Sequence, residues 1–329
     1  SSPAPATSKA ETLCFGFFYL YTMEKEFKAG FVNIIGLPNV GKSTLMNVLI
    51  GEKLSIITRK AQTTRHRILG IINDKESQII FSDTPGFIEN PAYKMQESMN
   101  EFVHSALKDA DIYLFIVELG TALEKQVTLY EKLQKTDKPV LLLVNKVDLA
   151  RDEIQTKNYI TRWQKVLPNA ETFIISALNK FNVDSVVHRI KQLIPTHPAY
   201  YDKEAFTDKT ERFFVSEIVR EKILLLFKQE IPYSCEVDVE SFKDEKKIVK
   251  ISAVIYTERA TQKSIIIGKG GESIKKLGTL ARKDIENSAV DIPSTSHLVR
   301  CPGIFDLFKY GYVIPLHKDI AIKSKGTNF

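Results

Sequence analysis

The stretch Gly36-Leu37-Pro38-Asn39-Val40-Gly41-Lys42-Ser43 has the spacing G-x-x-x-x-G-K-S. Residues 31–35 before it are apolar enough for a buried strand, and residues 44–50 after it have a helical pattern. A strand, a glycine-rich turn and a helix together form a phosphate-binding loop, because backbone N–H groups and the helix N-terminus favour an anion. We expect Lys42 to reach the β- and γ-phosphates of a nucleotide and the Ser43 hydroxyl to help hold Mg²⁺.

Length and composition limit the number of domains and the class of protein. A chain of 329 residues suggests two domains, and 43% hydrophobic with 26% charged residues is ordinary for a globular protein. The net charge of +6 is mild, but residues 259–283 alone carry seven basic side chains and one acidic, which also gives +6. The 3 cysteines form no disulfide or metal-ligand pattern, which fits a reducing cytoplasm.

The N-terminal residues 1–25 are expected to be an extension outside the fold. Leu13 to Met23 resembles the apolar core of a signal peptide, but no small-residue cleavage site follows. Met23 opens a polar stretch that reads like a natural start. The alternative, a membrane anchor, is disfavoured because no segment is long enough to span a bilayer.

Between residues 26 and 195, strand-like runs alternate with helix-length patterns. The expected strands after the first are Ile68–Ile72, Gln78–Ser82, Ile112–Val117, Val140–Asn145 and Thr172–Ser176. The expected helices are Met95–Asp109, Ala122–Thr136, Asp152–Val166 and Val183–Ile194. Such alternation predicts an α/β domain with a mainly parallel sheet, and ligands then bind at the carboxyl ends of the strands.

Two further motifs follow strand ends. In Asp83-Thr84-Pro85-Gly86, the carboxylate of Asp83 suits Mg²⁺ and the N–H of Gly86 suits a γ-phosphate, although this sequence alone is also a good β-turn. In Asn145-Lys146-Val147-Asp148, a carboxylate at Asp148 can accept two hydrogen bonds from guanine, which adenine does not offer. Lys146 would stack over the ring and Asn145 would hold the loop together.

The tripeptide Ser176-Ala177-Leu178 completes the expected base site, since the Ala177 N–H could meet the guanine oxygen. The expected GTP-binding residues are therefore Gly36, Asn39, Val40, Gly41, Lys42, Ser43, Thr44, Asn145, Lys146, Asp148, Ser176, Ala177 and Leu178.

This ordered set of motifs resembles the translation-factor class of GTPases, and two further stretches, Lys28–Gly36 and Ala61–Arg67, look like the Era family. The similarity covers roughly residues 27–286. It implies a GTPase that converts GTP to GDP and phosphate with slow intrinsic turnover, and that binds the 3′ region of small-subunit ribosomal RNA to assist assembly of that subunit. It also implies a monomer in the cytoplasm, and it allows peripheral association with the inner membrane.

The resemblance also assigns roles around the phosphates. Thr64 aligns with the switch threonine, a Mg²⁺ ligand when a γ-phosphate is present, and Thr63 is the neighbouring alternative. Many GTPases place a water-orienting glutamine where this chain has Phe87, which cannot orient water. Asn39 matches a position that helps ligate K⁺ in several relatives, so K⁺ is a candidate cofactor beside Mg²⁺. The expected catalytic residues are Lys42, Thr64, Asp83, Gly86 and Asn39, and the expected Mg²⁺ ligands are Ser43, Thr64 and Asp83.

The second domain is expected at residues 211–286, after a linker at 196–210. An apolar stripe at helical spacing and two alternating strand patterns precede Gly268-Lys269-Gly270-Gly271, which resembles the G-x-x-G loop of a type II KH domain. Such a loop clamps an RNA backbone because glycine lets a phosphate approach closely. The expected RNA-binding residues are Gly268, Lys269, Gly270, Gly271, Lys275, Lys276, Arg282 and Lys283, with bases received beside Ile265, Ile266 and Ile274.

Residues 287–329 do not match the family's lysine-rich third strand and terminal helix. Without that strand the RNA-binding groove would be incomplete, so one alternative function stays open. It is a regulatory GTPase whose C-terminal module binds protein or membrane instead of RNA.

Overall fold

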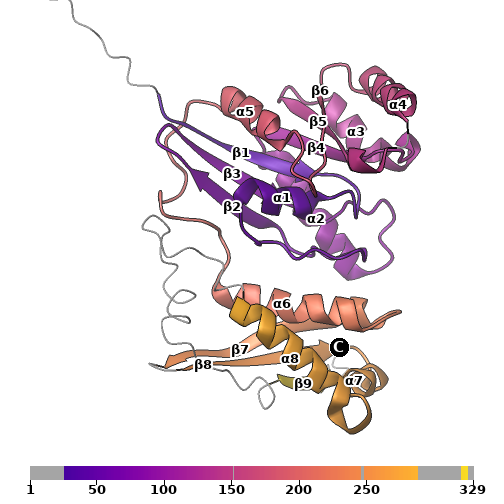
Figure 1. Cartoon of the computed structure of the whole chain (residues 1–329), viewed down its shortest axis with the longest axis vertical. Helices are drawn as coiled ribbons and strands as arrows, with labels where there is room; N and C mark the ends of the chain where they lie inside the picture. Colours follow the sequence, from indigo (N-terminus) through magenta and orange to yellow (C-terminus); the bar gives the residue numbers. More distant parts are fainter. Residues whose placement is uncertain (1–25, 151, 246–247, 288–319, 325–329) are drawn as a thin grey trace, which may run out of the picture.

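The computed structural model describes residues 26–150, 152–245, 248–287 and 320–324. These residues form two domains, with the phosphate-binding domain above and the C-terminal domain below in Figure 1. Expectations for residues 1–25 and for the tail, apart from 320–324, lie outside the described residues. Within the described residues, no helix combines the length and the apolar character needed to cross a bilayer.

The first domain is built on a six-stranded sheet in the order β2-β3-β1-β4-β5-β6. Neighbouring strands are parallel except β2 and β3, which pair antiparallel. The strands are β1 (Lys28–Ile35), β2 (Ile68–Asn73), β3 (Ser77–Asp83), β4 (Ile112–Glu118), β5 (Val140–Asn145) and β6 (Glu171–Ile174). The sheet is thus mainly parallel, as the sequence predicts.

Helices cover both faces of this sheet. They are α1 (Lys42–Ile50), α2 (Lys94–Asp109), α3 (Val127–Gln134), α4 (Glu153–Val166) and α5 (Val183–Leu193). Alternate residues of β4 enter opposite cores: Leu114 and Ile116 pack on the side of α1 and α5, while Phe115 and Val117 pack with Trp163 of α4. The unbroken apolar runs of the central strands follow from this burial on two faces.

Within the expected linker, residues 196–210, the part from Tyr201 to Thr207 lies along the edge strand β2. The Ile71 N–H donates to Phe206 O at 2.9 Å, and the Thr207 hydroxyl donates to Leu69 O at 2.6 Å. Tyr201 and Ala205 pack against the apolar side chains of β2 and β3. The connection between the domains therefore also covers a sheet edge, which otherwise would expose unpaired backbone groups.

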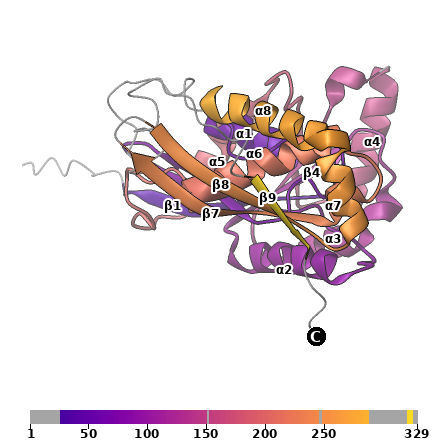
Figure 2. The same ribbon diagram turned by 90° about the horizontal axis from the view of Figure 1, so that it is seen from below.

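The second domain contains α6 (Glu211–Leu226), β7 (Cys235–Glu245), β8 (Ile248–Thr257), α7 (Ala260–Ile267), α8 (Glu272–Asn287) and β9 (Ile320–Ser324). Its sheet has the order β7-β8-β9, and the strands are visible from below in Figure 2. In Figure 1, α6 lies between this sheet and the first domain. A single apolar core joins α6, α7 and α8 to the sheet.

The tail supplies the strand that the sequence comparison with the family did not locate. β9 pairs parallel with β8, from Ala253 opposite Ile320 to Thr257 opposite Ser324. A short parallel strand cannot be assigned from five residues of sequence, because its partner is 67 residues away along the chain (320 − 253). Among the described residues, the second domain therefore has the order helix–strand–strand–helix–helix–strand.

Candidate functional site: a nucleotide site and an RNA-binding loop

The phosphate-binding loop joins the end of β1 to α1, as expected. The Lys42 side chain is buried, and its ammonium group donates to Gly36 O at 3.2 Å and Leu37 O at 2.7 Å. Burial lowers the pKa of Lys42 to about 8, while the nearby charge of Asp83 opposes this change. A buried cation that donates to backbone carbonyl oxygens is a ready partner for a phosphate.

Three oxygen side chains meet next to this lysine. The Ser43 hydroxyl donates to Asp83 Oδ2 at 2.7 Å and lies 2.8 Å from the Thr64 hydroxyl. Burial raises the pKa of Asp83, and the Ser43 hydrogen bond and the Lys42 charge oppose this rise. The other carboxylate oxygen, Oδ1, is buried and has no hydrogen-bond partner in the part of the chain that the structure describes. The structure thus brings together the three residues that the sequence predicts as metal ligands.

Gly86 lies against the phosphate-binding loop. A Cβ atom at position 86 would lie 2.6 Å from Pro38 Cα and backbone nitrogen, so only glycine fits there. The next N–H, that of Phe87, donates to Gly36 O at 3.2 Å. The Phe87 side chain is buried in the core beside His104. Phe87 therefore places no polar group at the phosphates, as the sequence predicts.

The base-recognition motifs converge through Asn145. Its Nδ2 donates to Val40 O at 2.8 Å, and its Oδ1 accepts from the Ala177 N–H at 2.9 Å. The expected donor to the guanine oxygen, Ala177 N–H, is therefore engaged with Asn145 in this structure. Asp148 is exposed at the same edge, and one of its oxygens accepts from the Ser176 hydroxyl at 2.6 Å.

Two more residues of the expected base site flank Asp148. Lys146 has a left-handed backbone (φ 65°) and pairs with Glu118 at 2.8 Å. The Leu178 side chain is 76% exposed and lies outside the hydrophobic core. The stem of Lys146 and the side chain of Leu178 thus lie at the surface, where a base could contact them.

Asn39 reaches the loop that precedes Thr64. Its Nδ2 donates to Arg59 O at 3.2 Å, and its backbone is left-handed (φ 64°). The Asn39 side-chain amide therefore lies against a backbone carbonyl beside the phosphate-binding loop. An amide oxygen and a backbone carbonyl are both oxygen ligands of the kind that alkali cations accept.

In the second domain, the G-x-x-G loop lies between α7 and α8. Gly268, Gly270 and Gly271 all have positive φ, at 73°, 61° and 80°. A Cβ atom on Gly268 would lie 2.3 Å from Ser273 Oγ, so this glycine allows the loop to close on α8. At Gly270 no atom lies within 4 Å of such a Cβ, so the tip of the loop is open.

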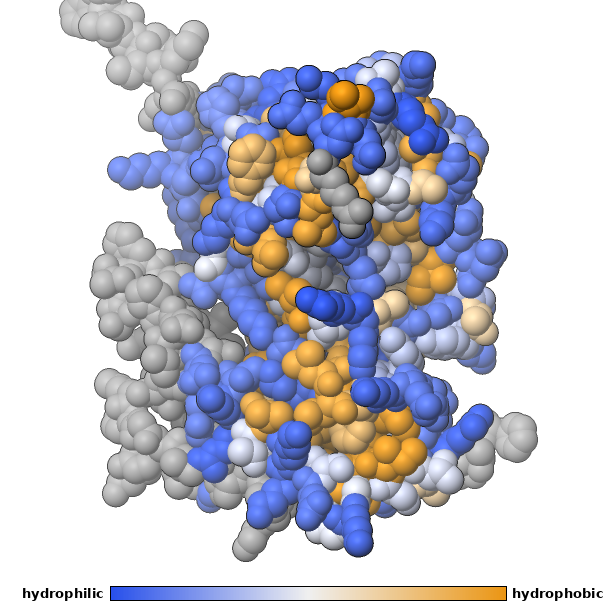
Figure 3. All heavy atoms as spheres, turned by 45° about the vertical axis from the view of Figure 1, so that its right-hand side comes forward, coloured by the Kyte–Doolittle hydropathy of each residue, from blue (hydrophilic) through white to orange (hydrophobic). Residues whose placement is uncertain are grey.

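The expected basic residues lie on the loop and on α8. Lys269, Lys275, Lys276 and Lys283 are exposed, whereas Arg282 pairs with Glu286 at 2.8 Å. Of the three expected apolar contacts, Ile266 is fully buried and belongs to the core, and Ile265 is 50% exposed. Figure 3 shows apolar surface on this domain bordered by hydrophilic side chains.

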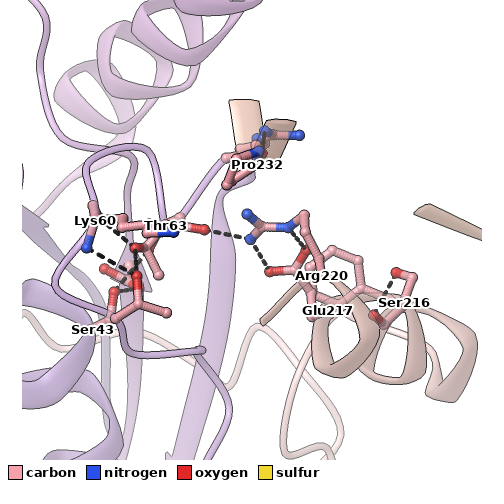
Figure 4. A network of polar contacts seen from close by, with 12 residues as sticks. Ser43, Lys60, Thr63, Ser216, Glu217, Arg220 and Pro232 are labelled. Atoms are coloured by element: carbon pink, nitrogen blue, oxygen red, sulfur yellow. Dashed lines mark hydrogen bonds and ion pairs between the residues drawn. The ribbon is translucent and has the colours of Figure 1, made fainter. Parts of the chain in front are cut away.

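The contacts between the two domains were not foreseen from the sequence. Arg65 donates to Cys235 O at 2.6 Å and to Pro232 O at 2.8 Å, and Arg220 of α6 donates to Thr63 O (Figure 4). Lys60 donates to Phe227 O. The only sequence signal was the run of basic residues between Thr58 and Arg67, which fits many roles.

Fold and sites together define a P-loop GTPase joined to a KH domain. Residues 31–146 match the family model described as "50S ribosome-binding GTPase", and residues 230–296 match the model "KH domain". The second match continues past Glu286, the end of the stretch that resembles the family by sequence alone.

The chain belongs to the Era family of GTPases. It is 40% identical over 260 residues to GTPase Era of Nitrosomonas eutropha, covering 79% of this chain and 88% of that protein. It is 43% identical over 265 residues to GTPase Era of Geotalea daltonii, covering 80% and 89%.

Solved structures agree with this assignment. An Aquifex aeolicus Era variant bound to GDP·AlF4⁻ aligns with a TM-score of 0.78 at 32% identity, covering 91% of this chain and 94% of that one. Era in complex with MgGDPNP and nucleotides 1506–1542 of 16S ribosomal RNA aligns with a TM-score of 0.76 at 32% identity, covering 91% and 92%.

Proposed function

We propose that this GTPase binds the 3′ region of small-subunit ribosomal RNA through the Gly268–Gly271 loop and assists assembly of the subunit. The observation that carries the proposal is the loop itself: three glycines with positive φ, an open tip, and exposed lysines on the helix that follows. A related protein has been solved with nucleotides 1506–1542 of 16S ribosomal RNA. We expect the GTP state to be the one that holds RNA, and hydrolysis to release it.

The proposal includes Mg²⁺ at Ser43, Thr64 and Asp83. The buried oxygen Oδ1 of Asp83, which lacks a hydrogen-bond partner among the described residues, fits a cation or a cation-bound water. The hydroxyls of Ser43 and Thr64 are the hard oxygen ligands that Mg²⁺ prefers. Mg²⁺ bound there would neutralise negative charge on the β- and γ-phosphates. Lys42 would contribute positive charge to the same phosphates, and the N–H of Gly86 would donate to the γ-phosphate.

The base would be guanine, selected by Asp148. The Ser176 hydroxyl donates to one oxygen of this exposed carboxylate. The carboxylate would accept from the ring N–H and the exocyclic amine of guanine. Asn145 connects Val40 to Ala177, so the phosphate and base loops keep a fixed spacing. GTP and GDP are thus the proposed ligands.

Three finer statements complete the proposal. K⁺ would assist hydrolysis beside Asn39, whose side chain lies next to the Arg59 carbonyl. The chain would act as a monomer in the cytoplasm, where ribosomal RNA is found, and it would associate with a membrane only peripherally. The oligomeric state, the location and the membrane association rest on the family resemblance.

Ultraviolet crosslinking in cells tests the RNA partner. The full chain is irradiated with its bound RNA, purified under denaturing conditions, and the RNA is sequenced. We expect reads concentrated at the 3′ end of small-subunit ribosomal RNA. A chain that recovers no RNA but crosslinks to a protein or a lipid would establish the alternative, a GTPase whose C-terminal module binds protein or membrane.

A further inference from the structure

The segment Thr63–Arg65 lies between the two domains and is buried, although it belongs to a loop. Relative exposures of Thr63, Thr64 and Arg65 are 9%, 8% and 6%. On one side of the segment is the nucleotide site, where the Thr64 hydroxyl lies 2.8 Å from the Ser43 hydroxyl. On the other side is the C-terminal domain.

The residue before Thr64 is fixed by α6. The Arg220 guanidinium donates to the carbonyl oxygen of Thr63, and that carbonyl belongs to the peptide group whose nitrogen is Thr64 N. Glu217 holds Arg220 through two bonds, at 2.7 Å to Nε and 2.5 Å to Nη2. Both side chains are buried. The orientation of the 63–64 peptide plane thus depends on an ion pair of the second domain.

The residue after Thr64 is fixed by the turn before β7. The Arg65 guanidinium donates to three backbone carbonyls there, those of Cys235 at 2.6 Å, Pro232 at 2.8 Å and Tyr233 at 3.3 Å. Burial lowers the pKa of Arg65 to about 10, so the group stays charged at neutral pH. A buried charge that donates to three carbonyls resists displacement, because leaving them would strand it without those partners.

Inside the first domain, the turn at residues 58–63 is held by local bonds and by Asn39. The Thr63 hydroxyl donates to Lys60 O at 2.7 Å and lies 2.7 Å from the Thr58 hydroxyl, and Asn39 Nδ2 donates to Arg59 O at 3.2 Å. Thr64 itself is contacted from this domain through its hydroxyl, which lies 2.8 Å from the Ser43 hydroxyl, whereas the second domain holds the residues on either side of it. Figure 4 shows the two sets of contacts, with Ser43 and Thr63 on one side and Arg220 and Glu217 on the other.

We propose that Arg220, held by Glu217, and Arg65 are positioning residues for Thr64, so that the C-terminal domain is required to build the Mg²⁺ site for GTP. This inference rests on the proposed role of Thr64 as a Mg²⁺ ligand. It adds which residues hold that ligand in place and from which domain they come. Because such coupling is reciprocal, binding of GTP and Mg²⁺, which orders Thr64, should in turn favour the contact between α6 and the segment Thr63–Arg65.

The test measures how Mg²⁺ slows release of a fluorescent, non-hydrolysable GTP analogue from the full chain. The main variant combines Glu217→Gln with Arg220→Met, which removes the ion pair without leaving a buried charge. We expect the Mg²⁺ concentration that gives half of this slowing, the Mg²⁺ midpoint, to rise about tenfold. For GTP hydrolysis we expect kcat to fall about tenfold, with KM nearly unchanged. Affinity for GDP should stay within about twofold, because Thr64 is a ligand only in the GTP state.

Two further variants sharpen the comparison. Arg65→Met leaves the Glu217–Arg220 pair in place and should also raise the Mg²⁺ midpoint. Lys53→Met is the matched control: Lys53 also bridges the domains, but its ion pair is with Glu221, at 3.0 Å, and not with any of residues 63–65. It should leave the midpoint unchanged. GDP binding and thermal unfolding report whether each variant is folded.

The outcomes separate this inference from the proposed function. If Thr64→Ala raises the Mg²⁺ midpoint but both arginine variants behave like Lys53→Met, the positioning role is wrong and the role of Thr64 stands. If Thr64→Ala leaves the midpoint unchanged, Thr64 is not a Mg²⁺ ligand and both statements fall. The double variant Thr64→Ala with Arg65→Met should raise the Mg²⁺ midpoint no more than the stronger single variant does. Such a result would support the inference, because both changes would then act through the same ligand.

Discussion

Gly41 and Asn145 lie so close together that a Cβ atom on Gly41 would be 2.3 Å from the side-chain nitrogen of Asn145. That nitrogen donates to Val40 O at 2.8 Å, and the other end of the amide accepts from Ala177. One side chain thus connects the phosphate loop to both base loops. The glycine of the phosphate-binding motif is needed here to make room for the asparagine as well as for phosphate.

This relationship predicts that Gly41→Ala disrupts nucleotide binding. The new methyl group would push Asn145 away from Val40, and we expect GDP affinity to fall at least about tenfold. Gly51→Ala is the control, because Gly51 also has positive φ (84°) but its Cβ would meet no atom within 4 Å. A fluorescence titration with labelled GDP measures both. Equal losses in the two variants would mean that backbone strain, rather than the Asn145 contact, matters.

Asp148→Asn should change the base that is bound. The substitution replaces an acceptor oxygen with a donor, which would face the exocyclic amine of guanine. Xanthine carries an oxygen at that position, so the variant should bind xanthosine triphosphate more tightly than GTP. Competition titrations with GTP, ATP and xanthosine triphosphate measure this. Wild-type protein that binds ATP as well as GTP would refute the guanine assignment.

Turnover should depend on K⁺ through Asn39. Phe87 is buried and offers no group to orient water, while Asn39 lies beside the Arg59 carbonyl. We expect faster GTP hydrolysis in K⁺ than in Na⁺ at equal ionic strength, and no such difference in Asn39→Ala. The same rate in both salts for wild type would exclude the cation from the mechanism.

Cys235 should react slowly with alkylating agents while the domains stay folded. Burial raises the pKa of its thiol from 9.0 to about 11, and the sulfur donates to Ile231 O at 2.9 Å. At pH 8 the thiolate fraction should be about a hundredfold below that of an ordinary thiol. The reaction is followed by mass spectrometry in a chain with Cys14→Ser and Cys301→Ser. Rapid labelling of the folded protein would show that the turn at 231–235 opens readily.

Local patterns were enough to predict the nucleotide site. Each motif follows an apolar strand, and the carboxyl ends of parallel strands lie at one edge, so Asp83, Asn145 and Ser176 had to converge there. The expected strand ranges agree with the structure to within a few residues, whereas the helix expected at Ala122–Thr136 is a 3-10 turn at Leu123–Gln126 followed by α3 at Val127–Gln134. The antiparallel direction of β2 was not predictable, since an apolar run has no direction.

Burial by the other domain could not be predicted. On α6, the apolar stripe that includes Val219 marks the core face, and no sequence motif assigns a role to Glu217 and Arg220. Both charged residues are buried because the loop around Thr63 covers them. Arg65 is one of several basic residues in its stretch of sequence, and nothing in that stretch indicates burial against a second domain. Hydrophobic periodicity describes a helix and its own core, and says nothing about a second domain.

The most direct test of the account is a titration of the full chain with a single-stranded RNA of the small-subunit ribosomal RNA 3′ end, in the presence of a GTP analogue. Gly270→Asp adds a negative charge at an open position with φ 61°, where Asp fits without a clash. Gly120→Asp is its match, with φ 86° and equally open surroundings in the first domain.

We expect Gly120→Asp to bind the RNA like wild type. Gly270→Asp should bind it about ten- to a hundredfold more weakly and keep its GTP affinity, because the added charge opposes a phosphate. If Gly270→Asp binds the RNA as tightly as wild type and Gly120→Asp do, the Gly268–Gly271 loop is only a turn, and the proposed RNA-binding function is wrong.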